Sequence, residues 1–272
     1  MGSMSSPAPA AFRWWTSAVP GLLPTAMFGL GEGAILPVIP TLADDLGATL
    51  AVAGFVAAML MIGELVGMLP GGWLVTRLSE RDVMIGAAAL SAAGAGIALI
   101  APSPLVLAIG LGVIGIAGAV FSLSRHSFMT IAVPLSHRAR ALSTLGGTMR
   151  VGRVIGPFLS AAILALGVPA QVILWIPIVA AVAIVVILLA SPDIEAPLRA
   201  VRAANPQRPA GVIATAVANW RVLGSIGIGA AILAGLRAAR MIVLPLWAAW
   251  AGLDPALAAL IIGLGAAVAH ET

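Results

Sequence analysis

The stretch RARALSTLGGTMRVGRVIGPFLS, residues 138–160, places arginines inside an otherwise apolar segment of helical length. Two of them, Arg150 and Arg153, lie where a helix that starts near Arg138 would be buried in hydrocarbon. An arginine inside a bilayer is costly, so its presence there indicates a functional role. The Gly156-Pro157 step is tolerated in a membrane helix where neighbouring helices repack around it. The stretch therefore predicts a membrane helix that carries functional charge.

The composition of the whole chain also indicates a membrane protein. Of its 272 residues, 61% are hydrophobic and 9% are charged, whereas soluble domains average about 45–50% apolar and about 25% charged residues. A soluble fold cannot hide so much apolar surface, so we expect an all-α integral membrane protein. The arginines behind the net charge of +4 are scattered between apolar segments, which excludes nucleic acid as a partner.

Other functional classes lack the residues that they need. The chain has no cysteine and three widely separated histidines, so we expect no metal site and no cofactor. The sequence contains no phosphate-binding loop of the form G-x-x-x-x-G-K-[ST], which argues against an ATP-driven pump. It also lacks the clustered acids, histidines or nucleophile of a membrane enzyme, so we expect no enzymatic activity.

Apolar runs of about 20 residues, the length that crosses a bilayer as a helix, recur along the chain. We expect eight spans, the last of them short: 19–41, 51–75, 83–101, 105–132, 142–166, 169–190, 222–249 and 256–269. The predicted organisation is a tail over 1–18, a six-helix bundle over 19–190, a polar linker over 191–221, and the start of a second, incomplete bundle over 222–272.

The arginines predict which side of the membrane each connection faces. They fall in every second connection, at Arg13, Arg77, Arg81, Arg138, Arg140, Arg199, Arg202, Arg208 and Arg221. Because cytoplasmic loops carry an excess of basic residues, we expect these connections and the N-terminus in the cytoplasm. The chain would then be a multi-pass protein of the inner or plasma membrane, with the lipid bilayer as its first partner.

A weak internal repeat relates the two predicted bundles. It aligns Arg13 with Arg221, Glu32 with Arg240 and Leu36-Pro37 with Leu244-Pro245. Parallel repeats about an axis along the membrane normal are a known transporter design. The repeat predicts that residues 222–269 restart the pattern of 19–75 and that most of the second half is absent.

This organisation resembles the major facilitator superfamily, whose members usually have two six-helix halves, and the resemblance covers nearly the whole chain. After its second helix the family has G-x-x-x-D-R-x-G-R-R; here Gly72, Arg77 and Arg81 match, whereas Thr76, Ser79 and Glu80 do not. In the fifth helix of its antiporters the family has G-x-x-x-G-P-x-x-G-G, which is similar to Gly152, Gly156 and Pro157, followed by Ser160 and Ala161.

The resemblance implies a secondary transporter that works by alternating access. Its antiporter-like motif implies efflux of a small organic molecule in exchange for protons. The alternative is a truncated fragment or partial subunit that does not transport and needs a missing C-terminal half as its partner. Helix packing is a further interpretation of the motif glycines, since Gly152-x-x-x-Gly156 and Gly63-x-x-x-Gly67 are small-xxx-small faces.

Charged residues within the predicted spans are the candidates for proton coupling and substrate binding. Counted from the cytoplasmic arginines at about 1.5 Å per residue, Glu64, Arg125 and Arg150 lie roughly 18–20 Å along their helices. His126 and Arg153 are close to this layer. Such a layer can be functional, or it can be a buried ion-pair network that only holds the bundle together.

A second charged layer is predicted farther from the cytoplasm. Glu32 lies about 19 residues from Arg13, Arg240 lies about 19 from Arg221, and Arg237 is one turn away from Arg240. The repeat predicts that Glu32 and Arg240 face each other across a central cavity, as a salt bridge between the halves or as part of a gate or substrate site. A carboxyl that gains and loses an arginine partner between states can act as a proton switch, which we predict for Glu32 and, second, for Glu64.

Overall fold

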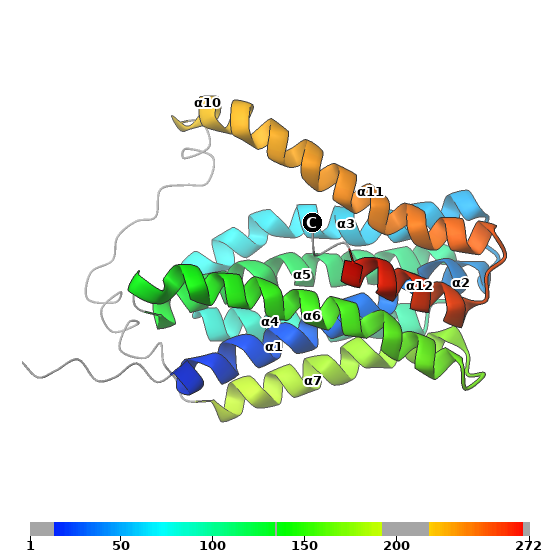
Figure 1. Cartoon of the computed structure of the whole chain (residues 1–272), viewed down its shortest axis with the longest axis horizontal. Helices are drawn as coiled ribbons and strands as arrows, with labels where there is room; N and C mark the ends of the chain where they lie inside the picture. Colours follow the sequence, from blue (N-terminus) through cyan, green and yellow to red (C-terminus); the bar gives the residue numbers. More distant parts are fainter. Residues whose placement is uncertain (1–13, 134, 192–217, 269–272) are drawn as a thin grey trace, which may run out of the picture.

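The structure is a computed structural model that describes residues 14–133, 135–191 and 218–268. Within these ranges every regular element is helical, which confirms the predicted all-α class (Figure 1). The elements are α1 (Trp14–Ile35), η1 (Leu36–Val38), α2 (Ile39–Asp44), α3 (Leu50–Arg77), α4 (Glu80–Leu99), α5 (Pro104–Ala132), η2 (Leu135–His137), α6 (Arg138–Leu164), η3 (Ala170–Leu174), α7 (Trp175–Ala190), α10 (Trp220–Val222), the π-helical turn η4 (Leu223–Gly227), α11 (Ile228–Trp250) and α12 (Pro255–Val268).

Each of the eight predicted spans corresponds to one helical segment, with ends that differ by a few residues. Among the described residues, six helices are long and apolar enough to cross a membrane. The 27-residue helix α6 carries four arginines, and α12 is shorter at 14 residues. Most of the predicted linker over 191–221 and of the predicted tail over 1–18 lies outside the described residues, so the division into two bundles stays a prediction.

Local chemistry explains where several helices begin and end. The side chains of Thr49, Ser79 and Ser103 accept hydrogen bonds from the backbone at the first turns of α3, α4 and α5. These contacts satisfy donors that a helix N-terminus leaves free. Past α2 and α6, Gly47 and Gly167 adopt φ values of 75°, a left-handed conformation that favours glycine. The same short turn therefore recurs where the chain reverses direction.

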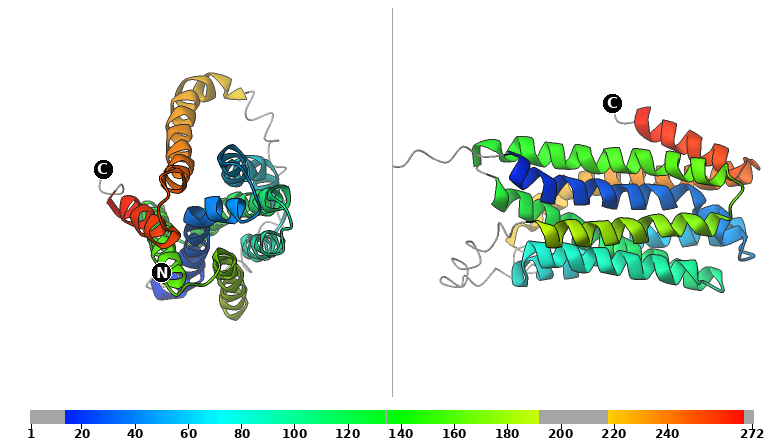
Figure 2. Two further views of the ribbon diagram at one scale, coloured as in Figure 1. Left: turned by 90° about the vertical axis from the view of Figure 1, so that its right-hand side faces the viewer. Right: turned by 90° about the horizontal axis from the view of Figure 1, so that it is seen from below.

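The bundle is organised around two sets of closely packed helices that run along one common direction (Figure 2). Helix α5 lies between α3 and α4, and α1 packs against α6 and α7. Their interface is filled by apolar side chains, including a stacked Phe28–Phe121 pair whose ring centroids are 4.3 Å apart. Glycines allow the backbones to approach, because a Cβ on Gly63 would collide with the carbonyl of Gly112. The helices that carry the charged residues are thereby held close together.

Helices α11 and α12 come after α7 in the chain, and they pack on the other helices in different ways. Helix α12 lies along α6, whereas α11 contacts α3 near its end and slants away towards α10 (Figure 1). A Cβ on Gly263 of α12 would lie 3.1 Å from the ring of Phe158, the residue after Pro157. The Gly-Pro segment of α6 therefore lies against α12.

Candidate functional site

Glu32 of α1, Glu64 of α3 and Arg153 of α6 meet inside the bundle. The Nε and Nη2 atoms of Arg153 donate hydrogen bonds of 2.9 and 2.8 Å to Oε2 of Glu32. The same Nη2 lies 3.7 Å from Oε1 of Glu64. One guanidinium thus joins carboxyl groups from two other helices, and its tighter partner is Glu32.

The three side chains differ in their exposure. The side chain of Glu32 is 4% exposed and that of Arg153 is 37% exposed, which places Arg153 between Glu32 and an open surface. The side chain of Glu64 is 27% exposed. Of the three side chains, Arg153 and Glu64 are therefore the more exposed and Glu32 is the buried one.

Glycines on both helices bring the backbone of Arg153 against α1. A Cβ on Gly33 would lie 2.5 Å from the carbonyl oxygen of Arg153, and a Cβ on Gly152 would collide with the carbonyl of Ala26. A Cβ on Gly156 would lie 2.5 Å from the backbone nitrogen of Ala34. The glycines of the antiporter-like motif therefore pack α6 on α1, and that packing sets the distance between Arg153 and Glu32.

Gly118 of α5 lies next to both carboxyl groups. A Cβ on Gly118 would lie 3.5 Å from Oε1 of Glu32 and 3.6 Å from Oε1 of Glu64, so both oxygens face the same glycine. The two carboxyl groups are therefore close enough to interact electrostatically with each other. Two carboxyl groups in such a position can hold one proton between them.

Arg125 of α5 is the second arginine of the cluster. The residue is 6% exposed, and its Nη2 lies 3.4 Å from Oγ of Ser122. Within the described ranges its buried Nε and Nη1 atoms have no hydrogen-bond partner. Arg125 is near enough to Arg153 and Glu32 to interact electrostatically with both.

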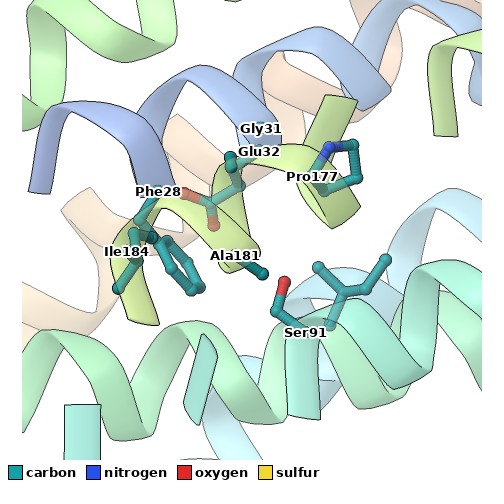
Figure 3. A pocket seen from close by; sticks show the side chains of 9 residues that line it. Phe28, Gly31, Glu32, Ser91, Pro177, Ala181 and Ile184 are labelled. Carbon is teal, nitrogen blue, oxygen red and sulfur yellow. The ribbon is translucent and has the colours of Figure 1, made fainter. Parts of the chain in front are cut away.

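A small cavity lies against Glu32 between α1, α4, α5 and α7 (Figure 3). Its polar lining comes from Glu32 and Ser91, and apolar residues such as Phe28 and Pro177 form much of the rest. It has room for about one water molecule.

The structure corrects part of the predicted charged layers. Arg150, Arg237 and Arg240 are exposed, and Glu32 has Arg153 rather than Arg240 as its partner. Glu32 also lies beside Glu64 and not in a separate outer layer. Counting residues from the cytoplasmic arginines failed here because it assumes that all helices begin at the same depth. In the structure, Glu32 of α1 contacts the same guanidinium as Glu64, which lies 13 residues before the end of α3.

His126 is exposed, and its Nδ1 lies 2.6 Å from the carbonyl oxygen of Ser122. This histidine is therefore a surface group next to the cluster and not a member of it. Sequence reasoning missed Gly118, Ser91 and Ser122. A serine inside an apolar span is a usable signal for the last two, whereas nothing marks Gly118 among the other glycines.

The residues of the predicted loop motif form a separate group at the end of α3 and the start of α4. Arg77 stacks on Trp73 at 5.4 Å, and Arg81 donates a 3.0 Å hydrogen bond to the carbonyl of Leu189 in α7. Gly72 has open space around it. Glu80, at a position where the family motif has arginine, is 1% exposed and accepts a 2.9 Å hydrogen bond from Ser127. The loop thus ties α4 to α5 and α7.

A bundle of apolar helices with a buried cluster of carboxylates and arginines defines a class, the membrane proteins that move solutes or protons. The comparison with known families identifies the group within that class. The sequence profile of the Major Facilitator Superfamily matches residues 22–270, and the chain belongs to this superfamily. It is a multi-pass membrane protein and not an enzyme.

Relatives of known sequence include transporters of different substrates. The chain is 28% identical over 156 residues to the galactose-proton symporter of Escherichia coli K12. The aligned segment covers 57% of this chain and 32% of that protein. It is 30% identical over 134 residues to the gallate transporter of Pseudomonas putida, covering 47% of this chain and 29% of that protein. The chain thus spans about a third of the length of these relatives.

Solved structures share the fold at low sequence identity. A bacterial homologue of the human lysosomal transporter Spinster, crystallised in an inward-facing and unoccupied conformation, superimposes with a TM-score of 0.66 at 16% identity. The match covers 97% of this chain and 61% of that one. The D-xylose-proton symporter gives a TM-score of 0.60 at 16% identity over 92% of this chain and 65% of that one.

Proposed function

We propose that this chain forms the proton-coupling part of a secondary transporter that moves a small organic molecule across the plasma membrane by alternating access. The observation that carries the proposal is the contact of Arg153 with Glu32 and Glu64. Arginine and glutamate are expensive inside a membrane and mark ion or substrate pathways there. The proton-coupled transporters among the relatives support the same function.

The cluster can convert protonation into movement. Arg153 holds Glu32 with two short hydrogen bonds and holds Glu64 more loosely at 3.7 Å. A proton on Glu32 removes the charge that binds Arg153 there, so the guanidinium would turn towards Glu64. Because the three residues lie on α1, α3 and α6, this exchange of partners changes the forces between three helices. Substrate would bind from the open side, where Arg153 and Glu64 are partly exposed.

The direction of transport has two candidates, each supported by a specific observation. The Gly152, Gly156 and Pro157 motif resembles that of antiporters and favours efflux of the substrate in exchange for protons. The galactose-proton symporter among the relatives favours movement of substrate and proton together. Both use the same cluster and differ in whether substrate and proton bind at the same time.

Proteoliposomes that contain the purified full chain and a trapped pH indicator test this proposal. Gallate and galactose, which name two of the relatives, are the first probes. We expect one of them to drive proton movement across the vesicle membrane. Entry of protons with the probe indicates symport, and movement in the opposite direction indicates antiport. Substrate flux without any proton movement would contradict the coupling.

The topology is a separate part of the proposal. The alternation of arginine-rich connections supports an N-terminus in the cytoplasm. Because the chain has no cysteine, a single cysteine in place of Ser136 or Asp45, which are both exposed, can be labelled without interference. We expect a membrane-impermeant thiol reagent, applied to intact cells, to label the cysteine at 45 and not the one at 136. Labelling at 136 alone would reverse the orientation.

A further inference from the structure

Arg125 is a buried cation that the described residues leave incompletely partnered. Its Nε and Nη1 atoms have no hydrogen-bond partner in 14–133, 135–191 and 218–268, and its only polar contact there is Nη2 with Ser122. A buried charge is strongly unfavourable unless it is paired and hydrogen-bonded. Arg153 next to it adds a second positive charge. This part of the cluster is therefore suited to a negatively charged ligand.

The charges of the cluster indicate how much negative charge is missing. Arg125 and Arg153 together balance Glu32 and Glu64 when both carboxyl groups are ionised. When the two carboxyl groups hold one proton between them, the four side chains carry one net positive charge. Binding of one monoanion then makes the cluster neutral, whereas a phosphate dianion would leave it with one net negative charge.

Two neighbours of Arg125 on α5 are less buried than Arg125 itself. Ser122 is half-buried and His126 is exposed, so a ligand that approaches Arg125 along α5 would pass them. Arg153 of α6 is partly exposed nearby. The hydroxyl oxygen of Ser122 accepts the hydrogen bond from Nη2, so its own O–H can donate to a ligand oxygen at the same time. A small anion that enters from this side meets Ser122 and then Arg125.

We propose that Arg125 binds the carboxylate group of a monoanionic substrate, and that this anion binds together with one proton on the Glu32–Glu64 pair. The proposal rests on the proposed function and names the substrate class of the same site. The guanidinium donors suit carboxylate oxygens. Because the proton and the anion bind together, they move in the same direction, so the proposal selects symport from the two candidate directions.

The proton part of the proposal depends on which charged groups surround the pair. Arg153 of α6 and Arg125 of α5 interact electrostatically with it, while the other titratable groups of the adjoining turns, His126 of α5 and Arg150 of α6, are exposed. Helix α7 contains no titratable residue between Trp175 and Ala190. In α4 the titratable residues are confined to the first turn, Glu80 to Asp82, far from Ser91 and the cavity. The Glu32–Glu64 pair is therefore the group that takes up the proton.

Ligand binding to the purified full chain in lipid nanodiscs tests the proposal, with acetate and benzoate as probes and benzamide as the neutral counterpart of benzoate. We expect a carboxylate probe to bind, benzamide to bind at least tenfold more weakly, and Arg125→Gln to weaken carboxylate binding at least tenfold. Arg77→Gln is the control, because it removes one arginine outside the cluster. If Arg125→Gln does not fold, Arg125→Lys should bind more weakly and still prefer benzoate to benzamide.

The pH dependence separates this site from a general attraction of anions. One proton bound with each anion weakens the apparent affinity by up to about tenfold per pH unit as the pH rises. This slope should flatten in Glu64→Gln, which cannot share the proton. Failure of both carboxylates to bind, equal binding of benzamide, or unchanged affinity in Arg125→Gln would overturn the inference. Proton-coupled flux of a neutral probe that survives in Arg125→Gln would also overturn it while leaving the proposed function intact.

Discussion

The strength of the Arg153–Glu32 contact can be predicted from its geometry. Removing one member of a buried ion pair costs about 3–5 kcal/mol, whereas an exposed pair contributes about 0.2–1 kcal/mol. Glu32 is buried, but the Arg153 side chain is 37% exposed, so solvent screening lowers the expected coupling to about 2–3 kcal/mol. The Arg153–Glu64 contact is longer, 3.7 Å, and partly exposed at both ends, so we expect about 1 kcal/mol or less.

Two double-mutant cycles measure these couplings. One combines Arg153→Gln with Glu32→Gln, and the other combines Arg153→Gln with Glu64→Gln. Unfolding in mixed micelles with increasing sodium dodecyl sulfate, followed by circular dichroism, gives the free energy of unfolding of each variant. We expect Arg153→Gln to be the most destabilising single change, because it leaves Glu32 buried without its partner, and the 32/153 double variant to recover part of the loss.

The comparison of the two coupling energies, 32–153 against 64–153, tests the geometry most sharply. The geometry requires a larger coupling for Glu32 than for Glu64. A 32–153 coupling under about 0.5 kcal/mol, the range of exposed pairs, would refute the inference that this ion pair is buried and strong. A larger coupling for 64–153 would show that Glu64 is the main partner of Arg153.

Three further predictions concern neighbouring contacts. Gly115→Ala places a Cβ against the carbonyl of Leu60 and 2.9 Å from the nitrogen of Glu64, so its unfolding free energy should fall by about 1–3 kcal/mol, while Gly86→Ala, in open space, should not be destabilised. Gly118→Ala places a methyl group in ordinary contact with Glu32 and Glu64, so stability should hold while substrate-driven proton movement in proteoliposomes falls several-fold. Ser127→Ala removes the hydrogen bond to buried Glu80 and should cost about 1–2 kcal/mol in the same unfolding assay, whereas Ser143→Ala on the exposed side of α6 should cost little.

Each of these predictions has a clear contrary result. Equal stability of the Gly115 and Gly86 variants would mean that α3 and α5 do not pack as closely as the structure has them. Unchanged proton movement in Gly118→Ala would mean that the space between the two carboxyl groups is unimportant. A Ser127 variant as stable as the Ser143 variant would mean that the Glu80 contact contributes nothing.

The helices could be predicted from the sequence because the membrane imposes a simple rule. A span needs about 20 apolar residues, and charged or turn-forming residues such as Asp44, Asp45 and Gly47 interrupt that pattern sharply. Hydrophobicity alone then locates the ends of each helix to within a few residues. The packing of Gly63, Gly152 and Gly156 was also predictable, because small residues four apart allow helices to approach.

The pairing inside the site was less predictable. Counting along a helix gives the position of a residue on the axis only relative to the start of that helix, and it does not say which neighbour lies opposite. Arg150 and Arg153 are one turn apart, yet Arg153 binds Glu32 and Arg150 is exposed. The difference depends on the rotation of α6 that the contacts of Gly152 and Gly156 with α1 impose. Such a rotation is a property of the packed bundle.

The central claim is that Glu32 and Glu64 carry the coupled proton. The most direct measurement is substrate-driven proton movement in proteoliposomes that contain Glu32→Gln or Glu64→Gln, using gallate or galactose, whichever the unaltered chain transports. Asp45→Asn, in the exposed turn after α2, is the matched control. The account predicts that both glutamine variants lose proton movement while Asp45→Asn retains it. Proton movement that persists unchanged in both glutamine variants would contradict the account.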